Sequence, residues 1–591
     1  MTLFELWAPN AGSVAVEALG RRTPMRASER GFWVLDLPDA GPGTAYGFVL
    51  DGEERAIPDP RARYLPGGVH GPAVVVDDGA YAWKHPGFRQ APLGHALVYE
   101  LHVGTFTPGG GGGGTFASAI ERLDHLAELG VTHVEVMPIN AFPGERGWGY
   151  DGVGLWAPHA AYCRGPGGED LGPDAFRAFV DACHGRGMAV VLDAVYNHLG
   201  PSGNYLERFG PYFTEKYHTP WGKAVNLDDR DSDIVRRFFV ENALMWLREY
   251  RVDALRLDAV HAFHDENAVP FLEELSVAVD ALEAQTGTPK ELIAEFDLND
   301  PRIVRPREAG GLGIDAQWND EFHHAVHAVL TGERSGYYES YGRVGQIAKA
   351  LRDAYVYDGQ YEPGRRRRHG RPATGLSGHR FVVFTQNHDQ VGNRARGERL
   401  SALVGEAKLK QAAALLLLAP YVPMLWMGEE WAASTPFQYF TDHQEPELAD
   451  AVREGRRREF AHFGWKPEDV PDPQSEETFR NSVLRWEELG AGAHARVLEW
   501  HRRLVRLRRE HPELTDGRRE EAAVAFGEPA EDRGGWLRYT KGSITALFNF
   551  GGSPAELESG GAGVVLAASP EGAMLGRSSV LVPGDGVVIL R

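Results

Sequence analysis

The sequence is poor in cysteine and has no long hydrophobic run. Cys163 and Cys183 are the only cysteines among 591 residues, too few for a disulfide framework or a cysteine-bound metal cluster. The longest apolar stretch, Ala412–Pro420, is too short to span a bilayer. The first residues, Met1–Trp7, lack the basic and apolar regions of a secretory signal. We therefore expect no membrane association and a location in the reducing cytoplasm.

Positive charge is also scarce relative to negative charge. Lysine and arginine number 62 against 83 aspartates and glutamates, which gives a net charge of −21. Such a surface repels phosphate backbones and anionic lipids, so nucleic acid and membranes are not expected as partners. Hydrophobic residues make up 43% and charged residues 25%, which is ordinary for a globular protein. The 71 glycines and 37 prolines predict many turns and long loops.

The N-terminal part, residues 1–92, consists of short alternating runs separated by turn residues. Strands are expected at Leu3–Trp7, Ser13–Glu17 and Gly31–Leu37, with turns at Pro9–Gly12 and Pro38–Gly41. We find no helical pattern in this part. Closely spaced short strands are typical of a β-sandwich, so we predict a separate N-terminal domain of that class.

From residue 93 to 514, short apolar runs alternate with longer amphipathic runs, as in a parallel α/β fold. Helices are expected at Phe116–Leu129, Asp174–Arg186, Ser232–Glu249, Glu266–Ala284 and Val497–Arg509. Eight strands are expected, the number that closes a (β/α)8 TIM barrel. These strands are Leu97–Leu101, His133–Met137, Met188–Val195, Val252–Asp258, Leu292–Phe296, Ile314–Trp318, Arg380–Thr385 and Tyr421–Met427. A short insertion follows the third strand at about 199–230.

Residues 515–591 are predicted to form a small all-β C-terminal domain. Its β-like runs are Ala522–Phe526, Gly535–Thr540, Ser543–Asn549 and Gly586–Leu590.

Two low-complexity segments interrupt the barrel pattern. Gly109–Gly114 is a run of six glycines without the lysine that a phosphate-binding loop needs, so we interpret it as a flexible loop. Arg365–Arg368 is a run of four arginines in a loop rich in glycine and proline. It is either a solvated loop or a loop that overhangs a polar cleft.

Reactive side chains follow four of the expected barrel strands. The segments are Asp193–His198, Arg256–His261, Ala294–Asp297 and Gln386–Asp389. In a parallel barrel the active site lies at the carboxyl ends of the strands, so these segments should meet on one rim. One acidic strand end means little, but four in order indicate a site.

These four segments resemble the signature regions of the α-amylase superfamily of glycoside hydrolases: DxxxNH at 193–198, RxD at 256–258, a strand-end glutamate at 295 and NHD at 387–389. The resemblance implies a retaining mechanism with Asp258 as the nucleophile, Glu295 as the acid/base and Asp389 as the stabiliser of the transition state. It also implies substrate-binding roles for Tyr150, His198, Arg256 and His388. It implies structural roles for Asp193 and Asn197.

Physical chemistry adds expectations for the two catalytic carboxyl groups. Retention requires them to lie about 5–5.5 Å apart, which adjacent barrel strands can supply. Arg256 lies two residues before Asp258 on the same face of its strand, so its charge should keep Asp258 ionised. Glu295 must carry a proton at neutral pH, which calls for a poorly solvated site or a neighbouring carboxylate.

We expect neither a metal ion nor a cofactor. Several members of the superfamily bind calcium near the positions of Asn197 and His261. The insertion at 199–230 has few clustered acids, apart from Asp228, Asp229 and two more close to the next helix.

Longer segments resemble one group within the superfamily, the maltooligosyltrehalose trehalohydrolases. They include DAVYNHLGPSGNY at 193–205, EFDLNDPR at 295–302, GGLGIDAQWNDEFHH at 310–324 and NHDQVGNR at 387–394. The resemblance implies a neutral maltooligosaccharide substrate with a trehalose end, cleavage of the α-1,4 bond next to that trehalose, and maltooligosyltrehalose synthase as the pathway partner. The N-terminal sandwich resembles the glycogen-associated modules of branching and debranching enzymes.

Three alternatives remain open at this point. A glycogen-branching enzyme would share the barrel and its acids but transfer the chain to a sugar hydroxyl. An isoamylase-type debranching enzyme would cleave α-1,6 bonds. A catalytically inactive glucan-binding protein is disfavoured, because decay usually removes at least one of the three acids Asp258, Glu295 and Asp389.

Overall fold

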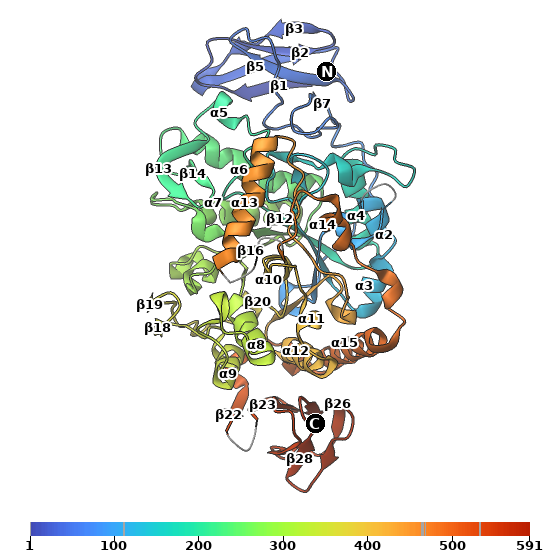
Figure 1. Cartoon of the computed structure of the whole chain (residues 1–591). Coiled ribbons are helices and arrows are strands. Elements are labelled where there is room, and N and C mark those ends of the chain that lie inside the picture. Colours follow the sequence, from blue (N-terminus) through green and yellow to red (C-terminus); the bar gives the residue numbers. More distant parts are fainter. Residues whose placement is uncertain (1, 110–112, 463–465, 467–468, 531–533) are drawn as a thin grey trace.

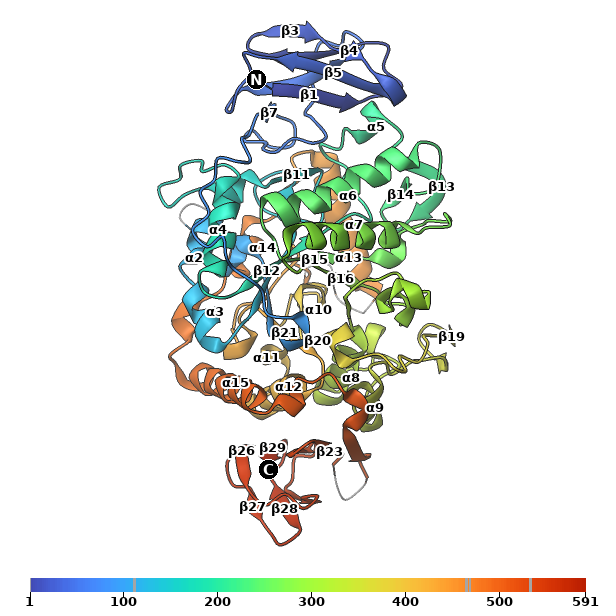
Figure 2. The same ribbon diagram turned by 180° about the vertical axis from the view of Figure 1, so that it is seen from behind.

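The chain forms a central α/β body with β-sheets at its two ends (Figure 1). We describe it from a computed structural model that covers residues 2–109, 113–462, 466, 469–530 and 534–591. The two chain ends lie at opposite ends of the molecule, which the view from behind also shows (Figure 2). The predicted glycine loop is only partly described, because residues 110–112 lie outside the described residues.

The central body is a closed barrel of eight parallel strands, as the sequence predicted. The strands follow each other around the barrel in chain order, so that neighbours in sequence are neighbours in the sheet. They are short and almost wholly buried, because helices cover the outside and side chains fill the inside. Their bounds are β8 (Val98–Leu101), β9 (His133–Val136), β12 (Ala189–Ala194), β15 (Ala254–Leu257), β16 (Glu291–Glu295), β17 (Ala316–Trp318), β20 (Phe381–Phe384) and β21 (Val422–Trp426).

Helices surround the barrel strands and close its outer layer (Figures 1 and 2). The main ones are α2 (Phe116–Ile120), α3 (Leu123–Leu129), α4 (Asp174–His184), α6 (Ser232–Glu249), α7 (Phe271–Thr286), α8 (Asp320–Thr331), α9 (Val344–Asp353), α12 (Glu406–Leu418) and α15 (Gly492–Glu510). Further helices lie in the connections: α1 (Val103–Phe106), α5 (Leu206–Phe209), α10 (His388–Gly392), α11 (Leu400–Leu403), α13 (Pro446–His462) and α14 (Glu476–Asn481).

The N-terminal region is built from two small antiparallel sheets. One has the order β1-β5-β4 and the other β3-β2-β6-β7. The rings of Phe4 and Tyr46, one from each sheet, pack edge to face with centroids 4.8 Å apart. No α-helix occurs among the described residues 2–92. The bounds are β1 (Thr2–Trp7), β2 (Val14–Ala18), β3 (Arg21–Pro24), β4 (Arg26–Ala27), β5 (Phe32–Leu37), β6 (Ala45–Leu50) and β7 (Ala73–Val74).

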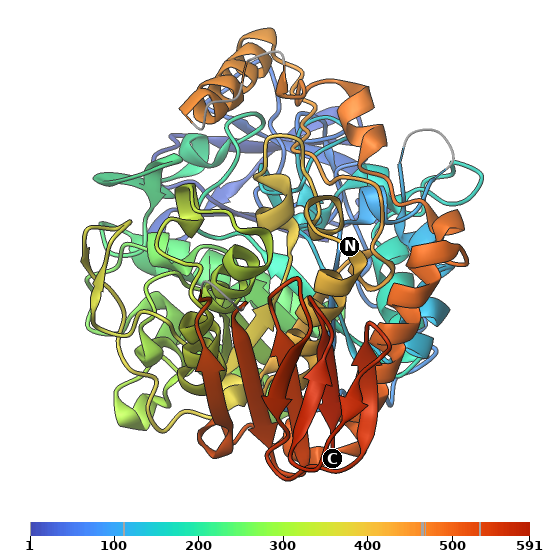
Figure 3. The same cartoon turned by 60° about the horizontal axis from the view of Figure 1, so that its bottom comes forward.

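The C-terminal region also consists of two antiparallel sheets, ordered β22-β23-β24-β29-β26 and β25-β28-β27, and Figure 3 looks onto these strands in red. Gln411 of α12 ties them to the barrel, because its amide nitrogen donates to the carbonyls of Asn549 and Gly586 at 2.8 and 3.0 Å. The bounds are β22 (Ala523–Gly527), β23 (Trp536–Lys541), β24 (Ile544–Asn549), β25 (Ala555–Glu558), β26 (Val565–Ser569), β27 (Met574–Leu575), β28 (Ser579–Val582) and β29 (Val587–Leu590).

Three local expectations need correction. The predicted helix Phe116–Leu129 is two helices, α2 and α3. The predicted helix Glu266–Ala284 begins only at Phe271, directly after Pro270, since proline favours an extended residue before it and a helix after it. The arginine run is not an irregular loop, because Arg367–Arg368 (β19) pairs with Tyr361–Glu362 (β18) in a hairpin.

We predict that Arg508 of α15 secures the barrel near the start of β21. Its buried guanidinium donates to the carbonyls of Leu417, Ala419 and Tyr421. Arg508→Met leaves these acceptors unpaired and should cost about 2–4 kcal/mol of stability. A thermal scan should show an apparent melting temperature lower by several degrees, whereas Arg502→Met on the same helix, where the side chain is 37% exposed, should change it little. Equal melting temperatures for the two variants would contradict the assignment.

Candidate active site

Arg256 of β15 lies at the centre of the rim and contacts three carboxylates. Its Nη1 is 2.7 Å from Asp193 Oδ2 and 2.8 Å from Asp258 Oδ1, and its Nη2 is 2.7 Å from Glu295 Oε2. The three acids come from the ends of β12, β15 and β16, which are adjacent strands. Beneath the guanidinium, the ring of Trp318 lies 4.2 Å from the Arg256 carbon Cζ. One arginine therefore fixes the relative positions of three strand ends.

Glu295 is held from the neighbouring strand end as well. Its Oε2 accepts hydrogen bonds from Arg256 and from the backbone N–H of Ala259, the latter at 2.8 Å. Ala259 has a φ of +38°, a left-handed conformation that a residue with a Cβ rarely adopts. This strained turn after Asp258 directs the Ala259 N–H at Glu295.

Burial makes full ionisation of this cluster costly. It raises the pKa of both Asp258 and Glu295, and the charge of Arg256 offsets only part of the effect at each. The pKa of Asp193 is also raised by burial and lowered in part by Arg256. A single guanidinium thus serves three buried carboxyl groups, so a proton bound within the cluster relieves their mutual repulsion.

Tyr150 and His388 form the side of the site nearest to β8. The Tyr150 hydroxyl donates to Asp193 Oδ2 at 2.6 Å and lies 2.7 Å from His388 Nε2. His388 is 1% exposed, and its Nε2 is 3.5 Å from Asp389 Oδ1. Burial alone lowers the pKa of His388, but the carboxylates of Asp389 and Glu100 outweigh it and raise the pKa to about 9. His388 therefore carries a positive charge at neutral pH.

These groups surround a cavity of about 420 Å³, a size that suits a sugar chain. Tyr150, His198, Asp258, Glu295, His388 and Asp389 all line it. Arg256 and Asp193 do not line it but contact residues that do: Arg256 donates to Asp258, and Asp193 accepts from Tyr150. Asn197 does not line the cavity; it is buried, and its side-chain amide has no hydrogen-bond partner among the described residues.

Sequence reasoning missed several aromatic residues of the lining, which are Trp148, Trp221, Tyr439 and Phe440. Trp221 lies at the turn between β13 (Phe213–Thr219) and β14 (Gly222–Val225), a hairpin within the predicted insertion. Its ring is 47% exposed and stacks on His198, with centroids 4.7 Å apart and planes 8° apart. Burial lowers the pKa of His198 to about 4, so this stack is neutral. An isolated tryptophan in a polar insertion was the available signal.

The basic hairpin β18–β19 reaches the same rim through one contact. Arg365 Nη2 lies 3.1 Å from Asp297 Oδ2, two residues after Glu295. This contact favours the interpretation of the arginine run as a segment near a polar cleft.

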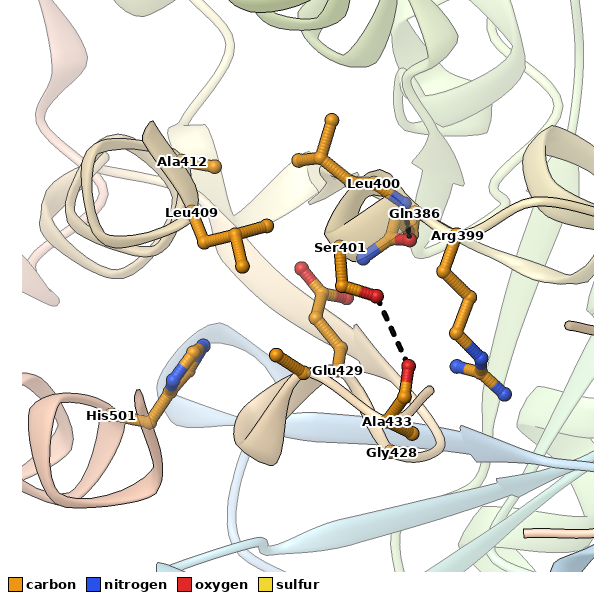
Figure 4. Close-up of a pocket in the computed structure, with 11 residues that line it drawn as sticks. Gln386, Arg399, Leu400, Ser401, Leu409, Ala412, Gly428, Glu429, Ala433 and His501 are labelled. Carbon is orange, nitrogen blue, oxygen red and sulfur yellow. Dashed lines mark hydrogen bonds between the residues drawn. The ribbon is translucent and has the colours of Figure 1, made fainter. Parts of the chain in front are cut away.

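Another cavity, of about 10 Å³, is lined in part by Gly428 and Glu429, which follow β21 (Figure 4). Ser401 donates to the Ala433 carbonyl across it at 3.0 Å, and Glu429 and Arg399 line it. Such a volume holds about one water molecule and no sugar. Asp258, Glu295 and Asp389 line the cavity of about 420 Å³ and not this one.

Within the described part of the chain, no three His, Cys, Asp or Glu side chains are arranged to hold a metal ion. No described helix is both long and apolar enough to cross a bilayer.

Comparison with known proteins agrees with this geometry. Residues 100–221 match the family model described as the alpha amylase catalytic domain. The chain is 46% identical to a malto-oligosyltrehalose trehalohydrolase of Rhizobium sp. (strain M-11), over 99% of this chain and 97% of that protein. It is 48% identical to the enzyme of that name from Arthrobacter ramosus, over 90% and 91%. A crystal structure of a putative alpha amylase from Salmonella typhimurium superposes with a TM-score of 0.88 at 39% identity, covering 99% and 97%. The chain belongs to the malto-oligosyltrehalose trehalohydrolases of the α-amylase superfamily.

Proposed function

We propose that the protein hydrolyses the α-1,4-glucosidic bond next to the terminal trehalose of maltooligosyltrehalose and releases trehalose. One observation carries this proposal: Asp258 and Glu295 line the same cavity, and each binds a different nitrogen of Arg256. A retaining glycosidase requires two carboxyl groups about 5–5.5 Å apart, a spacing that adjacent strands can supply. The names of the relatives support the choice of substrate.

In the first step, Asp258 attacks the anomeric carbon of the sugar that precedes the trehalose. As the new bond forms, the bond to the trehalose oxygen breaks, and Glu295 gives its proton to that oxygen. The positive charge of Arg256 favours the ionised form of Asp258. Trehalose leaves, and a glycosyl ester on Asp258 remains.

In the second step, Glu295 acts as a base because it has lost its proton. It takes a proton from water, the water oxygen attacks the anomeric carbon, and the ester bond to Asp258 breaks. Glu295 is then protonated again and Asp258 is free. Two inversions at the same carbon give overall retention of the α configuration.

The other lining residues act on the sugar in the cleaved position. Asp389 would bind its hydroxyl groups and favour the distorted ring of the transition state. Tyr150 offers an aromatic face, and the rings of His198 and His388 offer nitrogen atoms for hydrogen bonds to hydroxyl groups. Trp221 extends the aromatic surface beyond His198.

The proposed substrate is neutral, so the net charge of −21 has no steering role and serves solubility. The substrate must come from an enzyme that converts the reducing end of a maltooligosaccharide into trehalose, which is the reaction of a maltooligosyltrehalose synthase. The proposed compartment is the cytoplasm, which the free thiols of Cys163 and Cys183 support.

One chromatographic assay tests the function. Incubation with maltotriosyltrehalose should give trehalose and maltotriose in equal amounts, while amylose and pullulan should be cleaved poorly. Branched glucan as the product would favour a branching enzyme. Rapid cleavage of pullulan would favour a debranching enzyme, and no product from any substrate would favour a glucan-binding protein.

We predict that the maltotriose formed first is the α anomer. Retention requires this result, because both displacements occur at the same carbon. Proton NMR can follow the α and β signals of the new reducing end before mutarotation mixes them. An initial excess of the β anomer would refute the two-step mechanism and leave the substrate assignment intact.

A further inference from the structure

Glu100, a buried residue of the first barrel strand, binds His388 with both carboxylate oxygens. Its Oε1 lies 2.5 Å from His388 Nδ1, and its Oε2 accepts the His388 backbone N–H at 3.1 Å. The side chains of both residues are 1% exposed. Glu100 does not line the cavity, so it reaches the sugar only through His388.

The residues that flank Glu100 in the barrel sheet are an acid and a tryptophan. Its partners across the two adjacent strands are Glu135 on β9 and Trp426 on β21. Neither oxygen of the Glu135 carboxyl has a hydrogen-bond partner among the described residues. Burial and the neighbouring Glu100 raise the pKa of Glu135 well above its usual value, which favours its neutral form.

Charged and titratable groups face His388 from every side. Glu100 comes from β8, Glu135 from β9, Asp193 from β12, Arg256 from β15, and Asp389 from the same turn as His388. Tyr150 contacts Nε2, and the buried, neutral His102 lies further out. The remaining surroundings are the rings of Trp148, Trp318 and Trp426, at centroid distances of 5.8, 5.9 and 6.5 Å.

Hydrogen bonds link these groups in one chain, in which His388 donates to both of its neighbours and Asp193 accepts from both of its own. An imidazolium donates from both nitrogens: Nδ1–H to Glu100 and Nε2–H to the Tyr150 oxygen. Tyr150 can then use its own proton to donate to Asp193, which accepts from Arg256 in turn. The chain runs from Glu100 to the guanidinium that holds Asp258.

We propose that Glu100 is a positioning residue, which keeps His388 as a donor from both ring nitrogens and thereby fixes the Tyr150–Asp193–Arg256 chain beneath the nucleophile. This inference rests on the proposed function. Without the carboxylate, a neutral His388 has a single N–H, and the Nε2 that faces Tyr150 is then free to become an acceptor. Tyr150 would have to donate to it and would leave Asp193.

The test is Glu100→Gln, which keeps the shape of the side chain and removes its charge. At pH 7, kcat for maltotriosyltrehalose should fall about 10–100-fold, while KM changes less than about threefold. The proposal requires His388 to be protonated, and loss of Glu100 removes one cause of its raised pKa. The alkaline limb of the kcat profile should therefore move to lower pH by about one unit or more.

Two variants control this result. Glu135→Gln removes a carboxyl group from the same layer, but one whose burial without a hydrogen-bond partner among the described residues favours its neutral form. The pH profile of this variant should therefore match that of the unmodified enzyme. Glu100→Asp restores a carboxylate and should recover part of the alkaline limb. The proposal would be overturned if the alkaline limb of the kcat profile lay at the same pH in Glu100→Gln as in the unmodified enzyme. An unchanged kcat at pH 7 would also overturn it.

A direct measurement does not depend on these variants folding. In enzyme labelled with nitrogen-15 histidine, the imidazole signal of His388 is the one that disappears in His388→Gln. In the unmodified enzyme this signal should show two protonated nitrogens up to about pH 8, consistent with a pKa of about 9. A neutral ring at pH 7 would overturn the inference. Failure to release trehalose would instead refute the proposed function, and the NMR readout separates the two.

Discussion

Asp258→Ala is expected to lower kcat for trehalose release by at least about 10⁵-fold. The proposed covalent step has no nucleophile without this carboxylate, and a loss of this size corresponds to about 7 kcal/mol in the barrier. The fold should remain, because Arg256 keeps Asp193 and Glu295 as partners. The measurement is the initial rate of trehalose release from maltotriosyltrehalose, with circular dichroism as the check on folding.

Asp315→Asn is the matched control for this variant. Asp315 precedes β17 at the opposite end of the barrel, and its Oδ2 accepts the backbone N–H of Leu292 at 2.9 Å. The substitution removes an acid from the barrel far from the cavity, so kcat should stay within about threefold of the unmodified enzyme. If kcat of Asp258→Ala were within tenfold of that of the unmodified enzyme, Asp258 could not be the nucleophile.

Glu295→Gln is expected to lower kcat by about 10³–10⁵-fold on the natural substrate, because no proton reaches the departing trehalose oxygen. A maltotriosyl fluoride needs no such proton, since fluoride is a good leaving group. With this substrate the formation of the glycosyl ester should be almost as fast as in the unmodified enzyme. A burst of fluoride release followed by slow turnover is the expected signature, because water then lacks its base.

Azide distinguishes the two carboxylates by the configuration of the product. In Glu295→Ala, azide can attack the ester on Asp258 and should give the α-glycosyl azide from the fluoride. In Asp258→Ala, azide can only attack the substrate itself and should give the β-glycosyl azide. The same configuration from both variants would contradict the assigned roles.

The barrel could be predicted because its strands are buried on both faces. Segments such as Met188–Leu192 and Tyr421–Met427 are continuous apolar runs with acidic residues soon after their carboxyl ends, and this pattern can be recognised in the sequence without knowing which strands pair. The C-terminal sheets were harder to predict. Runs such as Ala555–Glu558 and Met574–Leu575 are short and largely exposed, so their apolar pattern is weak. Of the eight strands β22–β29 in the described part of this region, four were predicted.

The residues of the candidate site also include some that the sequence predicts and some that it does not. Its acids come directly after strands, so the sequence places them on one rim. Glu100 carries no such signal, since it lies within an apolar strand and its partner His388 is 288 residues further along the chain. Trp221 reaches the cavity through a hairpin whose position relative to the barrel no local pattern encodes. Contacts of this kind depend on how the closed barrel brings distant segments together.

The sharing of Arg256 by three acids has a consequence for engineering the enzyme. Any change that alters the pKa of one acid also alters the pKa of the other two, because all three bind the same guanidinium. A shift of the working pH cannot therefore be obtained by adjusting the acid/base alone, since the nucleophile would follow. An enzyme adapted to acidic or alkaline conditions is better sought by changing residues that surround the cluster without contacting Arg256. Such changes shift the pKa values of all three acids together and leave their hydrogen bonds in place.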